Sequence, residues 1–402
     1  MDTSTVIRNV RVFDGERVLP KADVLIDGDL IAAVAESPSD LRAATEVDGT
    51  GRTLLPGLID AHTHAFDGSL AQALTFGVTT ELDMFAMPDN VARLRRAAAE
   101  SDDVADVRTA QIGATAPNGH PIQIMGKLYG PFNTVAGPED AEGFVADRVA
   151  GGADYLKIVI DDGSSGGVSL PCLQPDSVAA LVSAAHSAGL KTIAHVASAH
   201  DSVVALDAGI DGLAHIHTDG DAERIAGLAA AYGVFVVGAM SFVEALTAET
   251  GRELWRDERI WQYLSAGARA AATAESTGFP VNPNGIHNAL ETAAAMHRAG
   301  VPLLAGTDAN DGPHGGFRAI HGASIHRELV LLTQAGLTPV AALAAATSVP
   351  ARHFGLTDRG RVAVGLRADL VLVQGDPTTD ITDTRSITDV WRRGTRHPRI
   401  SA

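Results

Sequence analysis

The chain of 402 residues has room for a barrel of about 250 residues and a smaller domain. Its formal net charge of −18, from 49 acidic and 31 basic residues, argues against nucleic acid or an anionic membrane as the main partner. The N-terminus has no signal-peptide pattern, no apolar run is long enough to cross a bilayer, and the single Cys172 excludes an internal disulfide. We therefore expect a cytoplasmic protein that acts on a small molecule, and we expect it to form a homo-oligomer.

The first residues have the pattern of short strands separated by turns, at 7–13, 22–26, 30–34 and 53–55. The same pattern returns near the end of the chain, at 370–373 and 387–391. We expect residues 1–56 and 358–402 to form one small β-sandwich domain from both termini.

Between these segments, eight apolar strand-like runs alternate with helical stretches. Near-continuous apolar strands that alternate with helices are typical of parallel strands buried on both faces. Eight such strands predict an α/β fold with a (β/α)8 barrel over residues 57–357. The predicted strands are 58–61, 78–84, 107–112, 155–160, 191–196, 212–216, 234–238 and 301–305.

Helical patterns are clear at 175–188, 289–298, 328–335 and 339–346. The stretches 117–138 and 240–288 are predicted to be irregular. Loops this long in a compact domain are often lids or substrate walls.

Ionisable side chains stand at the ends of several predicted strands. In a barrel of this kind the carboxyl ends of the strands carry the active site. His62 and His64 lie two positions apart on a strand, so their imidazoles face the same side. Alone this pair is a weak signal, because buried histidines are often only hydrogen-bonded. Together with Lys157, His195, His215 and Asp308 on other strands, the pair predicts a site for a divalent metal.

The chain resembles the amidohydrolase superfamily, in the branch of imidazolonepropionase-like hydrolases and metal-dependent prolidases. The similarity spans nearly the whole chain. It rests on the segments 56–64, 155–158, 194–195, 214–215, 306–308, 326–329, 335–339, 345–347 and 365–370.

The resemblance implies a centre of two divalent metal ions. His62, His64 and Asp308 would bind a buried ion, and His195 and His215 an exposed one. Zinc is the expected metal, with manganese and iron as alternatives.

Lys157 would bridge both ions as a carbamate formed with CO₂, since burial can lower the pKa of a lysine enough for it to react. The alternative is an ammonium group paired with Asp60 or Asp308, which would favour a single ion. Asp308 would also act as general base and acid, taking a proton from water and passing it to the leaving group. Otherwise it is a plain ligand or a helix cap.

Weaker candidates lie in the loops and in one helix. His120, after the third strand, is a catalytic candidate beside the substrate carbonyl. Tyr129, His217 and His326 are candidates for substrate binding, against the alternatives of a solvated loop or helix packing. The glycine-rich stretch 163–167 lacks the ending of a phosphate-binding loop and is interpreted as a flexible active-site loop.

These features favour hydrolysis of an amide-like C–N bond in an N-acyl amino acid, dipeptide, carbamate, urea or cyclic amide. A hydrolytic deaminase is one alternative, but Ser198 stands where deaminases of this superfamily usually carry glutamate. A barrel that kept its fold and lost its chemistry is the other alternative.

Overall fold

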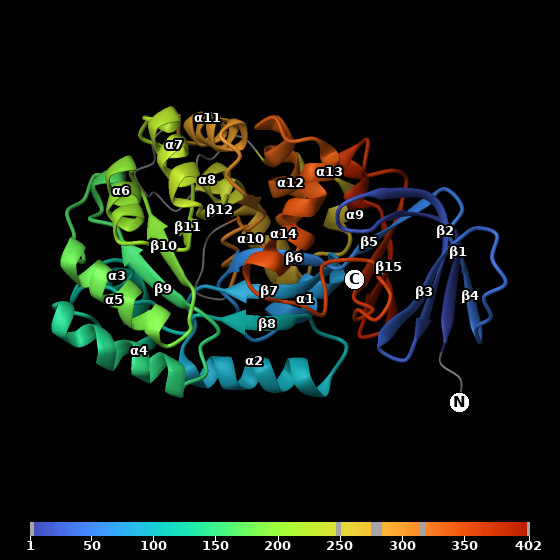
Figure 1. The fold of residues 1–402 in the computed structure, drawn as a ribbon, viewed down its shortest axis with the longest axis horizontal. Helices are drawn as coiled ribbons and strands as arrows, with labels where there is room; N and C mark the ends of the chain where they lie inside the picture. The colour runs from blue at the N-terminus through green and yellow to red at the C-terminus, as the bar shows by residue number, and fades with distance from the viewer. Residues whose placement is uncertain (1–3, 247–250, 275–283, 313–317, 400–402) are drawn as a thin grey trace.

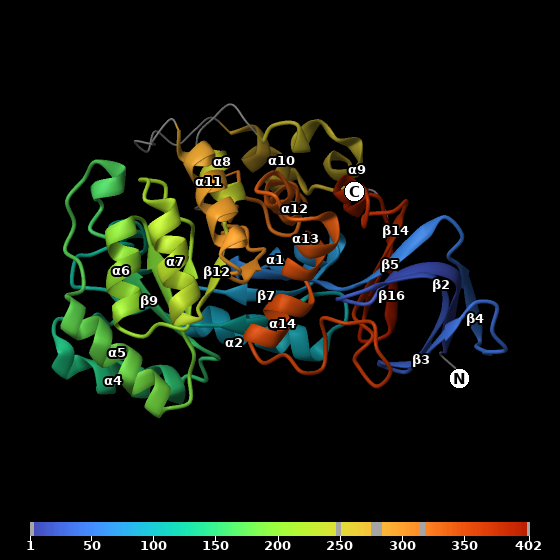
Figure 2. The ribbon, with the colours of Figure 1, turned by 45° about the horizontal axis from the view of Figure 1, so that its top comes forward.

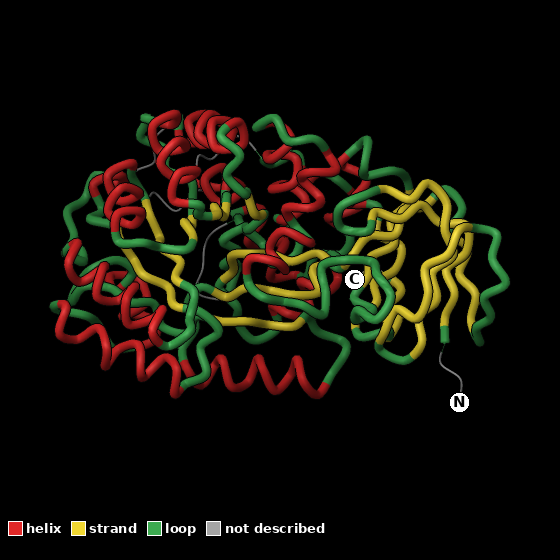
Figure 3. Tube along the Cα trace, in the orientation of Figure 1, coloured by secondary structure: helices red, strands yellow, loops and turns green. Residues whose placement is uncertain are grey.

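The computed structural model describes residues 4–246, 251–274, 284–312 and 318–399. A part built from strands and helices lies beside a part built mainly from strands (Figures 1 and 3). The strand-rich part contains the N-terminus and the last strands of the chain, coloured blue and red in Figure 1.

Both termini contribute strands to one eight-stranded sheet, as the pattern predicts. The chain path across it is β16-β15-β14-β5-β1-β2-β3, and β4 also pairs with β1. The strands form one hydrogen-bonded sheet, whereas the sequence predicts a sandwich. They are β1 (Thr5–Phe13), β2 (Val18–Asp27), β3 (Leu30–Glu36), β4 (Thr45–Asp48), β5 (Arg52–Pro56), β14 (Leu370–Gln374), β15 (Ile387–Arg392) and β16 (Thr395–Pro398).

The eight predicted strands of the middle segment are all present and pair in parallel. They form a three-stranded sheet, β6-β7-β8, and a five-stranded sheet, β13-β12-β11-β10-β9. Their bounds are β6 (Leu58–Thr63), β7 (Val78–Asp83), β8 (Asp106–Thr109), β9 (Leu156–Ile160), β10 (Thr192–Val196), β11 (Gly212–Ala214), β12 (Phe235–Val237) and β13 (Leu303–Leu304).

Hydrogen bonds join the two parallel sheets at both seams. At one seam Ala114 pairs with Ile158 of β9, and at the other Thr63 of β6 pairs with Ala309 after β13. The neighbour order of the strands therefore returns to its start, which is the order of an eight-stranded barrel.

Helices follow the strands and lie outside them, as Figure 2 shows for α5, α6, α7 and α11. Apolar faces of the helices and strands form one large core, and a second cluster lies among the strands, with Ile59, Ala61 and Ile193 as members. The helices are α1 (Ser69–Thr75), α2 (Pro88–Glu100), α3 (Ile122–Tyr129), α4 (Ala141–Ala150), α5 (Pro175–Ser187), α6 (Ala199–Asp207), α7 (Ala222–Tyr232), α8 (Met240–Leu246), α9 (Glu258–Trp261), α10 (Ala266–Thr273), α11 (Gly285–Arg298), α12 (Ile325–Gln334), α13 (Pro339–Ala345) and α14 (Ser348–His353).

The prediction of irregular structure at 117–138 and 240–288 was wrong in its described parts. The first stretch contains α3, and the second contains α8, α9 and α10. Short 3-10 turns also occur, at η1 (Pro138–Asp140), η2 (Ser164–Gly166), η3 (Leu254–Arg256) and η4 (Ile381–Arg385). Within the described ranges, no helix is long and apolar enough to cross a membrane.

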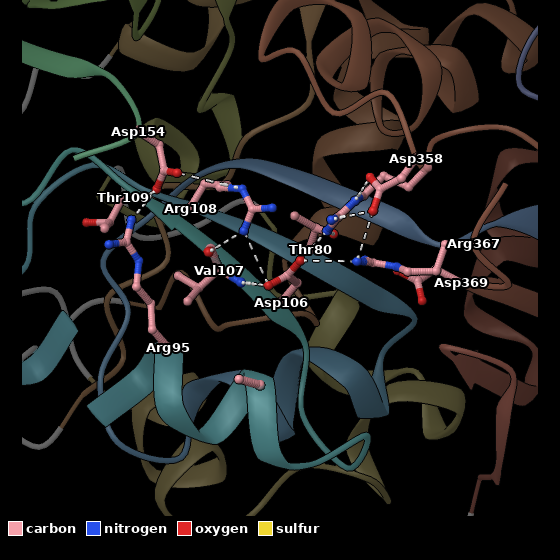
Figure 4. A network of polar contacts seen from close by, with 12 residues as sticks. Thr80, Arg95, Asp106, Val107, Arg108, Thr109, Asp154, Asp358, Arg367 and Asp369 are labelled. Carbon is pink, nitrogen blue, oxygen red and sulfur yellow. Dashed lines mark hydrogen bonds and ion pairs between the residues drawn. The ribbon is translucent and has the colours of Figure 1, made fainter. Parts of the chain in front are cut away.

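A buried ion-pair network links the segment after α14 to the start of β8 (Figure 4). Asp106 accepts hydrogen bonds from Arg359, whose Nη1 also donates to Thr80 Oγ1 at 3.0 Å, and Arg367 Nη1 lies 3.4 Å from Asp106 Oδ2. Burial opposes ionisation of Asp106, but the charges of Arg359 and Arg108 hold its pKa below the usual range. The network fixes the return of the chain from the barrel to the terminal sheet.

We predict that Arg359→Met lowers the free energy of unfolding by about 3 kcal/mol, because it removes the buried main partner of the largely buried Asp106 carboxylate. The exposed pair Arg93–Asp67 supplies the control, and Arg93→Met should cost less than about 1 kcal/mol. Urea denaturation measures both. Equal losses in the two variants would contradict a structural role for the Arg359 network.

Candidate metal centre

Two histidines from β6 and the residue after it face one carboxylate. His62 Nε2 lies 3.4 Å and His64 Nε2 lies 2.9 Å from Asp308 Oδ1. The two-residue spacing thus places both imidazoles on the same side, as predicted. Asp308 itself follows β13, so the seam between β6 and β13 builds this part of the site.

His215 joins the same group from the end of β11. Its Nδ1 lies 3.9 Å from Asp308 Oδ2, and its ring centroid lies 4.7 Å from that of His62. One ligand atom from each of His62, His215 and Asp308 lies within 4.8 Å of the others. The resemblance implies that His215 shares an ion with His195, and the ring centroids of these two histidines lie 4.5 Å apart.

Buried hydrogen bonds hold this ligand group in place. Asp60 Oδ1 accepts from the backbone N–H of His62 at 3.2 Å and of Thr307 at 3.0 Å. Asp60 Oδ2 accepts from Thr307 Oγ1 at 2.6 Å. Asp60 therefore positions the end of β6 against the segment that carries Asp308, and it is not paired with Lys157 by any described ion pair.

Burial favours the neutral forms of His62 and His215, and the neutral imidazole is the form that binds metals. The pKa values of His62 and His215 are lowered by burial and by the nearby charges of Lys157 and other histidines. Burial also lowers the pKa of Lys157 to about 7, against the opposing charges of Asp308 and Asp83. A fraction of Lys157 is therefore a neutral amine near pH 7.

A second ligand group lies next to the first, nearer the surface. His195, in β10, places Nε2 3.5 Å from Asp161 Oδ2, and His120 places Nδ1 4.0 Å from the same oxygen. Ligand atoms of these three residues also lie within 4.8 Å of one another. The ring centroids of His195 and His215, 4.5 Å apart, connect the two groups.

Asp161 was not predicted as a site residue. It follows β9 and lies four positions after Lys157, so regular alternation along the strand places both on one side. The same alternation could have identified it from the sequence, at the carboxyl end of a barrel strand. It was missed because the glycine-rich stretch that begins two residues later was interpreted as a flexible loop.

The buried polar atoms fit a cation better than they fit one another. Among the described residues, no hydrogen-bond partner is found for His62 Nδ1, His64 Nδ1 or Lys157 Nζ. Buried polar atoms are nearly always satisfied, so a cluster of unsatisfied ones suggests a missing partner. Imidazole nitrogen and carboxylate oxygen are the donors that zinc and similar divalent ions prefer.

Of the three residues predicted to bind substrate, two make hydrogen bonds within the protein and the side chain of the third is not described. His326 is fully buried, and its ring nitrogens lie 3.0 Å from Thr384 Oγ1 and 3.1 Å from the carbonyl of Phe76. These contacts join α12 to η4 and to the end of α1, so the prediction of a substrate contact was wrong. His217 is buried and its Nε2 lies 2.8 Å from the Gly220 carbonyl, which holds the loop before α7. The side chain of Tyr129 lies outside the described part of the structure.

Comparison with known proteins supports the family resemblance that the sequence motifs indicate. Residues 53–396 match the Amidohydrolase family. An imidazolonepropionase of Cereibacter sphaeroides is 29% identical, over 97% of this chain and 96% of that protein.

Two solved structures share the fold. A Xaa-Pro dipeptidase with bound methionine has a TM-score of 0.77 at 22% identity, covering 98% of this chain and 100% of its own. Molinate hydrolase has a TM-score of 0.77 at 19% identity, covering 98% and 95%. The chain therefore belongs to the amidohydrolase family, which confirms the predicted resemblance and the prediction of a hydrolase that acts on carbon–nitrogen bonds.

Proposed function

We propose that the chain is a metal-dependent hydrolase that cleaves an amide-like C–N bond of a small molecule. The observation that carries this proposal is the convergence of His62, His64 and His215 on Asp308, beside buried polar atoms without partners in the described structure. The curated relatives and the family match support the class of bond.

His62, His64 and Asp308 would hold the inner ion, and His195 and His215 the outer one, with zinc favoured and manganese or iron as alternatives. A divalent ion bound there supplies Lewis acidity toward a carbonyl oxygen and makes water a stronger acid. The protein's own part is to present neutral imidazoles and one carboxylate without rearrangement, because Asp60 and Thr307 already fix the strand ends.

Asp308 is the proposed general base and acid. Its carboxylate lies at the centre of the inner ligand group, where it can accept a proton from the attacking water. It then delivers that proton to the leaving nitrogen as the C–N bond breaks, so that water and an amide yield an acid and an amine.

Lys157 is the proposed bridging ligand after reaction with CO₂. The buried Nζ has no hydrogen-bond partner in the described structure, and its pKa of about 7 leaves neutral amine available. The neutral Nζ adds to the carbon of CO₂ and loses a proton, which leaves an anionic carbamate with two ligand oxygens. The carbamate replaces a cation that would repel metal ions with a group that binds them.

Deamination has less support. Ser198, in the position where a deaminase would need glutamate, caps α6 by accepting a hydrogen bond from the backbone of Asp201 at 3.1 Å. This structural role leaves that position without a group that titrates near neutral pH.

We predict that protein purified without chelator contains at least about one divalent ion per chain, and that removal of the metal abolishes hydrolysis. Asp308→Asn should lower kcat/KM by about 100- to 10,000-fold, the usual contribution of general acid–base catalysis. Asp67→Asn, at an exposed carboxylate after β6, is the control. Elemental analysis and a panel of N-acyl amino acids, dipeptides, carbamates and lactams test this prediction. Metal-free protein whose hydrolysis no added metal restores would contradict it.

We also predict a carbamate on Lys157. Protein equilibrated with ¹³C-labelled bicarbonate should show a carbamate signal by NMR that Lys157→Met abolishes. Lys191→Met removes an exposed lysine just before β10 and should leave the signal intact. An undiminished signal in the Lys157 variant would show that this lysine is not modified.

A further inference from the structure

We infer that a cavity at the amino ends of the barrel strands binds a small carboxylate that carries an aromatic ring. The cavity lies next to the starts of β8 and β9 and is bordered by the segment after α14. The residues of the proposed metal centre lie at the opposite, carboxyl ends of the strands, where barrels of this kind carry their active sites. The cavity is therefore a second site, separate from the proposed reaction.

The size of the cavity suits a small organic molecule. Its volume is about 370 Å³, near the lower end of the roughly 300–1,000 Å³ that small-molecule sites usually have. Gly355 borders this space, and a Cβ atom built on Gly355 would meet no other atom within 4 Å. One ring with a short acidic side chain fits such a space, whereas a folded peptide does not.

The two carboxylates of the lining are already bound by arginines that do not line the cavity (Figure 4). Asp154 Oδ2 lies 2.7 Å from Arg95 Nη2. Asp358 Oδ1 lies 2.8 Å from Arg359 Nε, and its Oδ2 lies 3.2 Å from Arg367 Nη1. Their negative charges are thus compensated within the protein, so they leave little attraction for a cationic ligand.

The Arg108 guanidinium is the lining group that is least satisfied by its neighbours. Its Nη1 lies 3.2 Å from the Val107 carbonyl and 3.5 Å from Asp106 Oδ1, and its Nε lies 3.7 Å from Asp154 Oδ1. These distances exceed the roughly 2.7–2.9 Å of a strong charge-assisted hydrogen bond. The side chain is 32% exposed, and its planar fork matches a carboxylate in a bidentate arrangement. Thr357, exposed at the same cavity, adds a hydroxyl donor.

An aromatic wall faces the same space. The half-buried Phe354 packs against the buried Tyr155 with ring centroids 5.1 Å apart, and against Phe235 at 5.5 Å. The Tyr155 hydroxyl already donates to the Asp83 carbonyl at 2.9 Å, so Tyr155 offers the cavity its ring and not a free donor. Neighbouring rings hold Phe354 in place, and a ligand ring can pack on it in the edge-to-face or offset geometry that aromatic pairs prefer.

Phenylacetate is the probe that tests the inference, with calorimetry on the full-length, metal-loaded protein. Phenylacetamide has the same shape without the charge, and benzylamine has the opposite charge. Inorganic phosphate is an anion without a ring. We expect one phenylacetate per chain at this site with a Kd below about 1 mM, and at least about 10-fold weaker binding of the other three probes.

Three variants locate the binding. Arg108→Gln removes the cation and should weaken phenylacetate at least about 10-fold, whereas Thr357→Val should weaken it about 2- to 10-fold. Gly355→Asn fills open space without touching the ion pairs, and asparagine tolerates the φ of 68° found there. It should also weaken binding at least about 10-fold. Arg224→Gln, at an arginine that is 60% exposed on α7, is the control and should bind as the wild type does.

Melting temperatures establish that each variant folds, and Gly355→Asn decides if loss of Arg108 unfolds the chain. A binding event that survives in both Arg108→Gln and Gly355→Asn lies elsewhere, and if no event is lost in them the inference fails. Benzylamine or phosphate that binds as tightly as phenylacetate also overturns it, because the charge or the ring is then not recognised. Absence of binding at tenfold above the expected Kd overturns it as well. None of these outcomes depends on hydrolysis, so they are independent of the proposed function.

Discussion

The seam between β6 and the segment after β13 is the constraint on which the site depends. The carbonyl of His62 accepts the N–H groups of Thr307 and Asp308, at 3.2 and 2.8 Å, and Asp60 braces the same segment from the side. The same hydrogen bonds close the ring of strands and bring His62 and Asp308 together. A shift of one residue at this seam would turn the ligands away from each other, because side chains alternate between faces along a strand. The same hydrogen bonds therefore stabilise the fold and bring the candidate metal ligands together.

Burial of this many polar groups without mutual pairing is costly, and the chain limits the cost by keeping them neutral. Burial lowers the pKa of His62 and His215 and lowers that of Lys157 to about 7, which favours the uncharged forms of these three side chains. The apolar residues around them exclude water and make electrostatic contacts stronger. The same burial that destabilises the charged forms prepares the nitrogens to bind a cation and the lysine to react with CO₂.

The sequence predicted the strands because buried parallel strands leave unbroken apolar runs, and it indicated the candidate site residues because they interrupt those runs at the ends. It missed β4 and β16, which are short and rich in polar residues. His326 was misjudged because its partners, Thr384 and the Phe76 carbonyl, come from segments far away in the chain whose packing no local pattern reveals. Asp161 was missed although a local pattern indicates it. The alternation of side chains along β9 places it on the same side as Lys157, but the stretch that follows was interpreted as a flexible loop.

Strained backbone at the strand ends completes the arrangement. Leu213 packs in the core shared with the helices and Ala214 among the strands, so regular alternation would send His215 toward the helices. A positive φ of 73° at His215 turns the chain there, and Ala239 and Asp308 have φ values of 49° and 52°. Such conformations cost on the order of 1–3 kcal/mol each for residues other than glycine and persist only where neighbours hold them. Here each of the three donates its N–H to the next strand end in the ring, to Val237, Gly306 and His62 respectively. The hydrogen bonds that close the ring of strands thus also hold the bends that aim ligands into its mouth.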